Sequence, residues 1–391
     1  MATKINGSTM RVLYWSELFW PYIGGVEVLS AKLLPELRDR GCEIIVVTSH
    51  DFLDLPDRAE YKGISIYRFP FRSAISTGNI GQLFELRGEV SKLKQTFQPD
   101  LVHVNAVSPS VLFHLQTIDA CSVPTLVTMQ QEILPKEGAG CATLMGEALR
   151  SADWVSCVSS AVLAQVLGWV PELRSRSSVI YNALEMELDS PKPLPEKPPR
   201  LLCVGRLVPA KGFDIALQAM ALIAARFPEI RLTVAGGGPL QTELERKADE
   251  LGLSNRVEFL GWVEPDKVAS VINESSIVLM PSRREGLPIV AVQAAMMGRP
   301  VIGTRVSGIP EVVLDGETGM LIDPEDAAGL MRALSFLLAH PKVAVRMGDT
   351  ARIRAQELFN WDRCVADYYL LYQKLIKEVT YAEFGHSRAR V

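Results

Sequence analysis

The sequence lacks the patterns that would assign a metal site, a disulfide framework or a common catalytic motif. Its six cysteines are scattered without a C-x-x-C pair, and its five histidines show no ligand spacing, so we expect neither disulfides nor a bound metal. No G-x-S-x-G, Walker A or G-x-G-x-x-G context occurs, which argues against hydrolases, kinases and ordinary dehydrogenases. We therefore expect chemistry that needs no metal or other cofactor.

The chain also lacks an excess of basic charge and any long apolar run. Its formal net charge is -4 with 22% charged residues, which gives no support to a nucleic-acid partner. The N-terminus has no apolar core of signal-peptide length, and the longest apolar stretches are too short or too interrupted to span a membrane, so we expect a soluble cytoplasmic protein. Basic residues in 86–97, with Arg68 and Arg72, leave peripheral membrane contact open, although a run this modest is more often a solvated helix face.

What the chain does have is a repeated alternation of apolar strands and helices. A strand at MRVLYWS, a helix over residues 28–41 and a strand at EIIVVTS form a β-α-β unit, and the alternation continues through residues 10–188. The proline-rich stretch 189–200 reads as a linker, and the pattern then restarts over 201–360, followed by a long amphipathic helix over 361–380. Near-continuous apolar strands alternating with helices predict two α/β domains, each a doubly wound parallel sheet.

The stretch IVLMPSRREGLPIVAVQAAMMGRPVIGT, residues 277–304, predicts a strand, a charged loop and a helix. Pro288 suits the first helical position, so Glu285 is expected at the helix mouth beside free backbone N–H groups, where anions bind. Gln293 follows about a turn and a half later. A solvated loop charge and a helix-surface glutamine are the simpler interpretation of this stretch taken alone.

Two further loops of the second half follow predicted strands. Arg206 and Lys211 project after RLLCV, and such a cation pair suits a diphosphate. Gly237 lies in AGGGPL after the next strand, where glycines let a ligand approach the backbone. Ligands of open parallel sheets sit beyond the carboxyl ends of the strands. Solvated cations and an ordinary glycine corner are the alternatives.

In the first half, Gly24 and Gly25 precede a predicted helix and could hold an anion through backbone N–H groups or could only make a tight turn. Gln130 follows the strand TLVTM at the same expected sheet edge. His103 lies inside the strand LVHVN, which favours a core histidine with its hydrogen bonds satisfied over a general base.

Taken together, PYIGGVE, VGRLVPAKGFD, VAGGGPL, FLGWV, PSRREGLPIVAVQAAMMGRPVI and SGIPEVVLDGETGMLIDPED resemble the retaining nucleotide-sugar glycosyltransferases of family 4. The resemblance runs from about Met10 to the C-terminal helix. It implies the GT-B fold, with two Rossmann-like domains, a donor cleft between them and a C-terminal helix that crosses back to the first domain. The implied activity is transfer of a sugar from a nucleotide-sugar donor to an acceptor hydroxyl with retention, without a metal.

The resemblance also implies roles for individual residues. Arg206 and Lys211 would hold the donor diphosphate, and Glu285 would contact sugar hydroxyls. Val263 would lie beside the base, and Gly25 would approach from the first domain. The backbone after the glutamate would line the sugar and phosphates, through Gly286, Leu287, Pro288 and Ile289.

Two residues depart from the family pattern. Gln293 stands where a second glutamate bonds the ribose; glutamine can accept from one hydroxyl but carries no charge. Gln130 stands where a histidine contacts the donor sugar, and it cannot titrate. A catalytically silent sugar-nucleotide-binding or partner-binding protein therefore stays open, as does a GT-B epimerase or phosphorylase. The acceptor, the donor sugar and base, and the oligomeric state cannot be predicted from the sequence.

Overall fold

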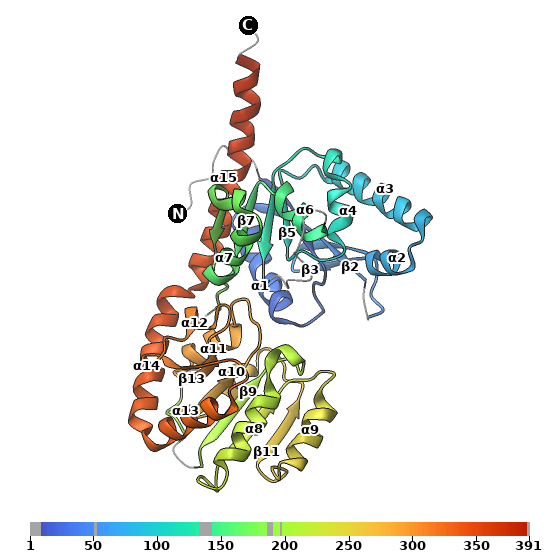
Figure 1. Cartoon of the computed structure of the whole chain (residues 1–391). Coiled ribbons are helices and arrows are strands. Elements are labelled where there is room, and N and C mark those ends of the chain that lie inside the picture. Colours follow the sequence, from blue (N-terminus) through green and yellow to red (C-terminus); the bar gives the residue numbers. More distant parts are fainter. Residues whose placement is uncertain (1–8, 51–52, 133–142, 186–190, 196–197, 389–391) are drawn as a thin grey trace. The chain divides into compact units, whose positions relative to one another are not determined.

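The computed structural model describes residues 9–50, 53–132, 143–185, 191–195 and 198–388, with side chains as far as Glu378. The chain forms two compact units. The first comprises Met1–Ile180 and Arg363–Val391, and the second comprises Tyr181–Asp362. Each unit is an α/β sheet covered by helices (Figure 1).

The first unit is built on an eight-stranded sheet with the order β3-β4-β2-β1-β5-β6-β7-β8. Its central strands are buried apolar runs, as predicted, and they pair in parallel register; Val12 lies beside both Ile44 and Leu101, for example. The strands are β1 (Met10–Ser16), β2 (Cys42–Ser49), β3 (Arg58–Tyr61), β4 (Ile64–Phe69), β5 (Leu101–Asn105), β6 (Thr125–Met129), β7 (Trp154–Cys157) and β8 (Ser177–Val179).

One edge of this sheet departs from the predicted parallel arrangement. Strand β3 pairs with β4 in antiparallel register, through a two-residue turn at Lys62 and Gly63. Both turn residues have positive φ, 46° and 75°. Positive φ at both central positions is the requirement of a type I′ turn, whose twist matches that of a β-hairpin.

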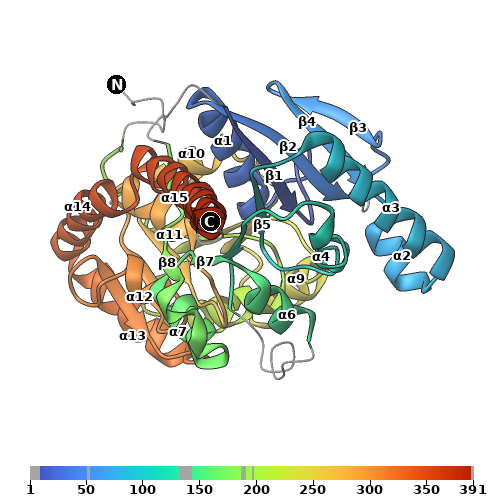
Figure 2. The ribbon, with the colours of Figure 1, turned by 90° about the horizontal axis from the view of Figure 1, so that it is seen from above.

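The helices of the first unit are α1 (Gly25–Asp39), α2 (Phe71–Thr77), α3 (Ile80–Phe97), α4 (Val111–Leu115), α6 (Leu144–Ser151) and α7 (Ser160–Trp169), with short 3₁₀ turns at Ile118–Ala120 and Pro171–Ser175. Both views place α2 and α3 at one end of the unit and α7 at the other (Figures 1 and 2). None of the helices in the described residues is long and apolar enough to cross a membrane.

The C-terminal helix α15 (Trp361–Arg388) belongs to the first unit from Arg363 onward. Its side chains contact residues of β5 and β7. The Tyr372 hydroxyl lies 2.6 Å from His103 Nδ1, and Lys374 Nζ lies 3.6 Å from the ring centre of Trp154. The amphipathic pattern of the chain's end is therefore explained by burial against the first sheet.

The second unit has a six-stranded parallel sheet with the order β11-β10-β9-β12-β13-β14. Its strands are β9 (Arg200–Val204), β10 (Arg231–Ala235), β11 (Val257–Gly261), β12 (Ile277–Met280), β13 (Val301–Thr304) and β14 (Gly319–Ile322). Its helices are α8 (Phe213–Ile223), α9 (Gln241–Glu250), α10 (Val268–Asn273), α11 (Ile289–Met296), α12 (Ile309–Val312), α13 (Ala327–Ala339) and α14 (Pro341–Leu358), with a 3₁₀ turn at Pro209–Lys211.

Each sheet has one point where the chain reverses the direction in which it adds strands. In the first unit that point lies between β1 and β5, and in the second between β9 and β12. Loops that leave neighbouring strands there turn to opposite faces of the sheet, which opens a crevice beyond the carboxyl ends. The predicted site residues fall on the loops that leave these strands and their neighbours.

Candidate functional site

The centre of the site in the second unit is an ion pair between two loops at the switch point. Lys211 Nζ, after β9, lies 2.7 Å from Glu285 Oε1, after β12. The two residues are 74 positions apart in the chain. The structure therefore joins the predicted diphosphate-binding lysine to the predicted sugar-binding carboxylate.

Glu285 is buried and held by its own loop. Its side chain is 7% exposed and that of Lys211 is 28% exposed. The Ser282 hydroxyl donates to Oε1 at 2.8 Å, and the Glu285 backbone N–H donates to Ser307 Oγ at 3.2 Å. A buried carboxylate with a cation and a hydroxyl as partners is fixed in place rather than solvated, so the simpler interpretation of Glu285 as a solvated loop charge is wrong.

Helix α11 begins at this carboxylate. The first hydrogen bonds to Pro288 O come from the N–H groups of Ala291 and Val292. The N–H groups of Ile289 and Val290 precede these bonds and point out of the helix start. Pro288 itself is the N-cap, with φ -75° and ψ 101°, so the helix begins one residue later than predicted; proline restrains φ but leaves ψ extended here.

Gln293 lies on the accessible face of α11. Most of this helix is buried, whereas Ile289, Val290 and Gln293 are half-buried. These three residues share one face because positions three and four apart on a helix are neighbours. Gly286, Leu287 and Pro288 are buried.

The glycines after β9 and β10 allow the backbones of these loops to touch. A Cβ on Gly236, whose φ is 140°, would lie 1.9 Å from Gly205 O. A Cβ on Gly212, whose φ is 64°, would lie 1.9 Å from Pro281 O. By contrast, a Cβ on Gly237 would meet nothing within 4 Å. Gly237 is therefore the glycine of this group with open space beside it.

Arg206 and Val263 lie on loops at the same sheet edge, after β9 and β11, with β10 between these two strands. Arg206 is exposed and makes no ion pair with the described residues, so its guanidinium is available to an anion. Val263, half-buried, follows β11 at the far edge of the sheet. The structure thus brings Lys211 and Glu285 into contact and leaves Arg206 unpaired near them.

The switch point of the first unit carries a polar network around Gln130. Gln130 Nε2 donates to Asn105 Oδ1 at 2.8 Å, and Asn105 Nδ2 donates to Ser30 Oγ at 3.0 Å. Gln130 is half-buried, whereas Asn105 is 2% exposed. This network joins the ends of β5 and β6 to α1. It fixes the amide of Gln130 at the carboxyl edge of the sheet.

Gly24 is the N-cap of α1 and Gly25 its first residue. A Cβ on Gly25 would meet nothing within 4 Å, whereas one on Gly24 would lie 2.2 Å from the flexible Glu27 Oε2. Neither glycine has positive φ, so neither is required by the backbone conformation. Open space at a helix start is compatible with an approaching ligand, although the carboxylate of Glu27 stands in the first turn.

His103 is a core residue, as predicted. It is fully buried, and its ring nitrogens lie 2.6 Å from the Tyr372 hydroxyl and 2.7 Å from Thr128 Oγ1. Burial lowers the pKa of His103 to about 3. In the part of the chain that the structure describes, no group of three or more His, Cys, Asp or Glu side chains is arranged to hold a metal ion.

Two of the basic residues that left peripheral membrane contact open lie inside the first unit. Arg68 is 3% exposed and donates to the carbonyl oxygens of Pro56 and Trp20. Lys94 is fully buried, and Nζ donates to the carbonyl oxygens of His114 and Thr117. Both side chains are buried and donate to backbone carbonyl groups, so they are not available to an anionic surface.

Three polar residues of these sites were missed by sequence reasoning. Ser282 and Ser307 hold the Glu285 loop, and Asn105 holds Gln130. Serine and asparagine are common in loops and carry no signal of their own there. Their position directly after buried strands was the one available indication.

The chain has two Rossmann-like sheets, and one of them carries a lysine, a buried carboxylate and a helix start at its switch point. This architecture is that of the GT-B glycosyltransferases. Residues 23–188 match the model of Glycosyltransferase Family 4, and residues 186–354 match that of Glycosyl transferases group 1. The chain belongs to the family 4 glycosyltransferases, enzymes that transfer a sugar from a nucleotide-sugar donor.

Individual relatives agree with this assignment. An uncharacterised glycosyltransferase of Methanocaldococcus jannaschii is 27% identical over 94% of this chain and 99% of its own. A GDP-mannose-dependent α-(1-6)-phosphatidylinositol monomannoside mannosyltransferase of Mycolicibacterium smegmatis is 35% identical over 42% of this chain and 44% of its own. The fold is also similar to that of a sucrose-phosphate synthase from Thermosynechococcus elongatus, with a TM-score of 0.82, 24% identity and coverage of 94% of this chain and all of that one.

Proposed function

We propose that this protein transfers a sugar from a nucleotide sugar to an acceptor hydroxyl with retention at the anomeric carbon, without a metal. The observation that carries the proposal is the contact of Lys211 with the buried Glu285 at the start of α11. A cation, a fixed carboxylate and free N–H groups together suit a sugar joined to a diphosphate.

In the proposed mechanism, the carbon–oxygen bond between the sugar and the diphosphate breaks, and the nucleoside diphosphate leaves with the bonding electrons. Lys211, Arg206 and the N–H groups at the start of α11 stabilise the negative charge that develops on the leaving group. This charge stabilisation is the role that a metal would otherwise fill.

Glu285 orients the sugar by accepting hydrogen bonds from its hydroxyls. Because Lys211 is its partner in the absence of donor, the lysine must divide its hydrogen bonds between the carboxylate and the phosphate when donor binds. The acceptor hydroxyl attacks the anomeric carbon from the face that the diphosphate leaves, and its proton passes to a leaving phosphate oxygen. This step asks for no titrating side chain and so tolerates Gln130.

Gln293 hydrogen-bonds a ribose hydroxyl in this proposal. Its position on the accessible face of α11 supports the assignment, and an amide can accept from one hydroxyl and donate to another acceptor. The backbone from Gly286 to Ile289 lines the sugar and phosphates, and Val263 and Gly237 lie beside the nucleoside. Residues 10–188 form the acceptor side, and within them Gly24, Gly25 and Gln130 contact the donor.

The test is a calorimetric titration with nucleoside diphosphates and with sugar nucleotides that include GDP-mannose and UDP-glucose. GDP-mannose is included because the mycobacterial relative is named for it. We expect one donor to bind, with Arg206→Ala weakening both the diphosphate and the sugar nucleotide, and Glu285→Ala weakening only the sugar nucleotide. A protein that binds none of them is a silent scaffold, in which Gln130 and Gln293 mark the loss of activity.

Two assays then test transfer itself. Donor consumption should rise with an added acceptor, and the screen begins with inositol-bearing lipids because of the relative's name. Product anomeric configuration, measured by NMR, should match that of the donor. Activity should persist in excess EDTA, and a loss that Mg²⁺ restores would contradict the metal-free mechanism.

A further inference from the structure

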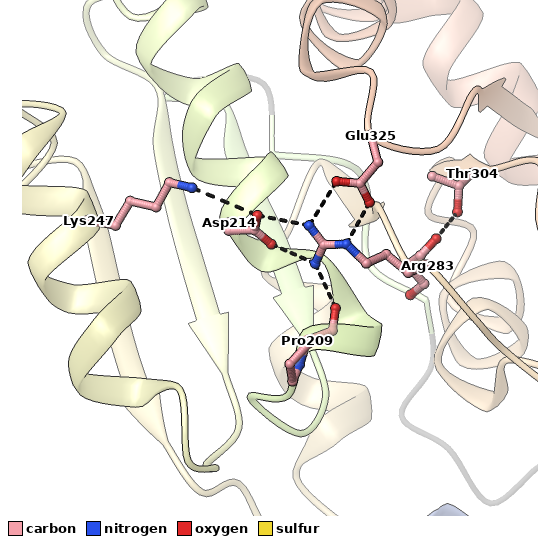
Figure 3. A network of polar contacts seen from close by, with 7 residues as sticks. Pro209, Asp214, Lys247, Arg283, Thr304 and Glu325 are labelled. Carbon is pink, nitrogen blue, oxygen red and sulfur yellow. Dashed lines mark hydrogen bonds and ion pairs between the residues drawn. The ribbon is translucent and has the colours of Figure 1, made fainter. Parts of the chain in front are cut away.

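Arg283, two residues before Glu285, uses every N–H group of its guanidinium. Nε and Nη2 donate to the two oxygens of Glu325 at 2.5 and 2.9 Å. Nη1 and Nη2 donate to the two oxygens of Asp214 at 2.9 and 3.0 Å. The remaining N–H of Nη1 donates to Pro209 O at 2.7 Å (Figure 3). Since arginine has five such donors, none is left for a ligand.

The charges around Arg283 also cancel. Lys247 Nζ lies 3.8 Å from Asp214, so two cations face two carboxylates. Burial alone would raise the pKa of the Asp214 carboxyl, but the hydrogen bonds and charge of Arg283, with the charge of Lys247, outweigh it, and the pKa lies below its usual value. The cluster adds no net positive potential. Arg283 is therefore not a further phosphate ligand, although it stands beside the site.

Arg283 instead ties together loops that leave three strands. Its own loop follows β12, Pro209 and Asp214 lie in and after the loop that follows β9, and Glu325 follows β14. Its backbone N–H also donates to Ala210 O at 2.8 Å. Glu325 has a φ of 62°, a conformation that a non-glycine residue keeps only where its surroundings fix it.

Two of the three loops so joined carry the functional pair. Pro209 precedes Lys211 by two residues, and Arg283 precedes Glu285 by two residues. The Thr304 hydroxyl, at the end of β13, donates to Ser282 O at 2.5 Å. This bond holds Ser282, the residue before Arg283. The loops that carry the lysine and the carboxylate are thus joined by contacts outside the pair itself.

We propose that Arg283 is a positioning residue for donor binding: it holds Lys211 at the place where Lys211 can contact both Glu285 and the donor diphosphate. This inference rests on the proposed function for its ligand. It differs from a purely structural role, because it requires the effect of Arg283 on the ligand to pass through Lys211.

A double-mutant cycle tests this dependence. The variants are Arg283→Met, Lys211→Met and the pair, and the measurement is calorimetric affinity for UDP and GDP at constant salt. We expect Arg283→Met alone to weaken diphosphate binding about tenfold, because small displacements of a binding group cost affinity steeply. In a protein that already carries Lys211→Met, adding Arg283→Met should lower the diphosphate affinity by less than about twofold. Equal losses in both backgrounds, or no loss in either, would overturn the inference.

Two further variants separate geometry from charge. Arg305→Met removes another arginine–carboxylate contact, with Asp315, at the same edge of the sheet, and should leave diphosphate affinity unchanged. Arg283→Lys keeps the charge but offers one nitrogen, which cannot bridge two carboxylates and a carbonyl. It should lose as much affinity as Arg283→Met. Full affinity in Arg283→Lys, or an equal loss in Arg305→Met, would contradict the positioning role.

A measurement without ligand distinguishes failure of this inference from failure of the proposed function. Amide hydrogen exchange in residues 206–212 and 284–288 should accelerate together in Arg283→Met and in neither segment of Arg305→Met. Unchanged exchange overturns the inference even where donor binds normally. If both segments exchange faster in Arg283→Met but the unmodified protein binds no nucleotide, the proposed function is overturned. Arg283 is then still shown to join the two loops.

Discussion

Removal of the Lys211 ammonium should destabilise the loop of Glu285 in the absence of any ligand. The substitution Lys211→Met leaves a carboxylate that is 7% exposed without its cation. Breaking a buried pair from one side costs about 3–5 kcal/mol. The lysine is 28% exposed and the Ser282 hydroxyl stays in place, so we reduce the expected cost to about 2 kcal/mol.

This loss of local stability can be measured as faster amide hydrogen exchange, by mass spectrometry of peptides from residues 281–296. The measurement does not assume that the two units unfold together. A cost of about 2 kcal/mol corresponds to exchange about thirtyfold faster. Adding Glu285→Gln should restore most of the protection, because a neutral amide needs no cation and can still accept from Ser282.

A matched control and the refuting results complete this test. Lys192 and Glu274 form a pair at 2.9 Å in the same unit, but both side chains are 55% exposed. Lys192→Met should therefore change stability by less than about 0.5 kcal/mol. Exchange in Lys211→Met within twofold of the unmodified protein would refute the reasoning. So would a double variant that stays as labile as Lys211→Met, since the buried charge would then not be the cause.

Three other predictions rest on single positions. Gly348→Ala should lower the free energy of unfolding in urea titrations by about 1–3 kcal/mol, because its Cβ would lie 2.0 Å from a backbone carbonyl oxygen. Gly88 lies in α3 with open space beside it, so Gly88→Ala should raise the same free energy by about 0.5–1 kcal/mol. Burial, partly offset by the charge of Cys121, lowers the pKa of Lys94 to about 8. Between that pH and the ordinary lysine pKa the unfolded chain binds more protons than the folded chain, so the free energy of unfolding should rise with pH. Urea titrations should show a rise of up to about 3 kcal/mol across this window relative to Lys94→Met. Gly237→Ala should keep its stability and bind diphosphate about tenfold more weakly in calorimetry, while Gly236→Ala, 1.9 Å from a carbonyl, should lose thermal stability.

The sequence predicted best where a strand is a near-continuous apolar run. β1, β9 and β12 lie where MRVLYWS, RLLCV and SIVLM indicated, because burial on both faces favours apolar side chains along the middle of such a strand. Lys211 and Glu285 were both predicted on loops at the carboxyl edge of the sheet, and the structure adds their direct contact. The hairpin at Lys62 and Gly63 had a readable signal in a glycine turn beside short alternating strands, and it was overlooked.

Features that depend on distant partners could not be predicted from local pattern. Arg283 stands in a charged tripeptide, and the sequence offers no reason to pair it with Asp214 and Glu325, which lie 69 and 42 positions away. Arg68 and Lys94 were counted among the basic residues that left peripheral membrane contact open. Their burial depends on backbone carbonyls that only the folded chain brings to them.

The first unit is completed by the last part of the chain. Tyr372 and Leu375 of α15 are 0% and 2% exposed, and Tyr372 supplies a hydrogen-bond partner for the buried His103. During synthesis, residues 1–180 emerge first, yet this surface stays uncovered until the 182 residues of Tyr181–Asp362 have been made. At roughly 5–20 residues per second that interval is about 10–35 seconds. The order of translation therefore lets the second unit finish folding before the first, and truncation ahead of α15 leaves the first unit without part of its own interior.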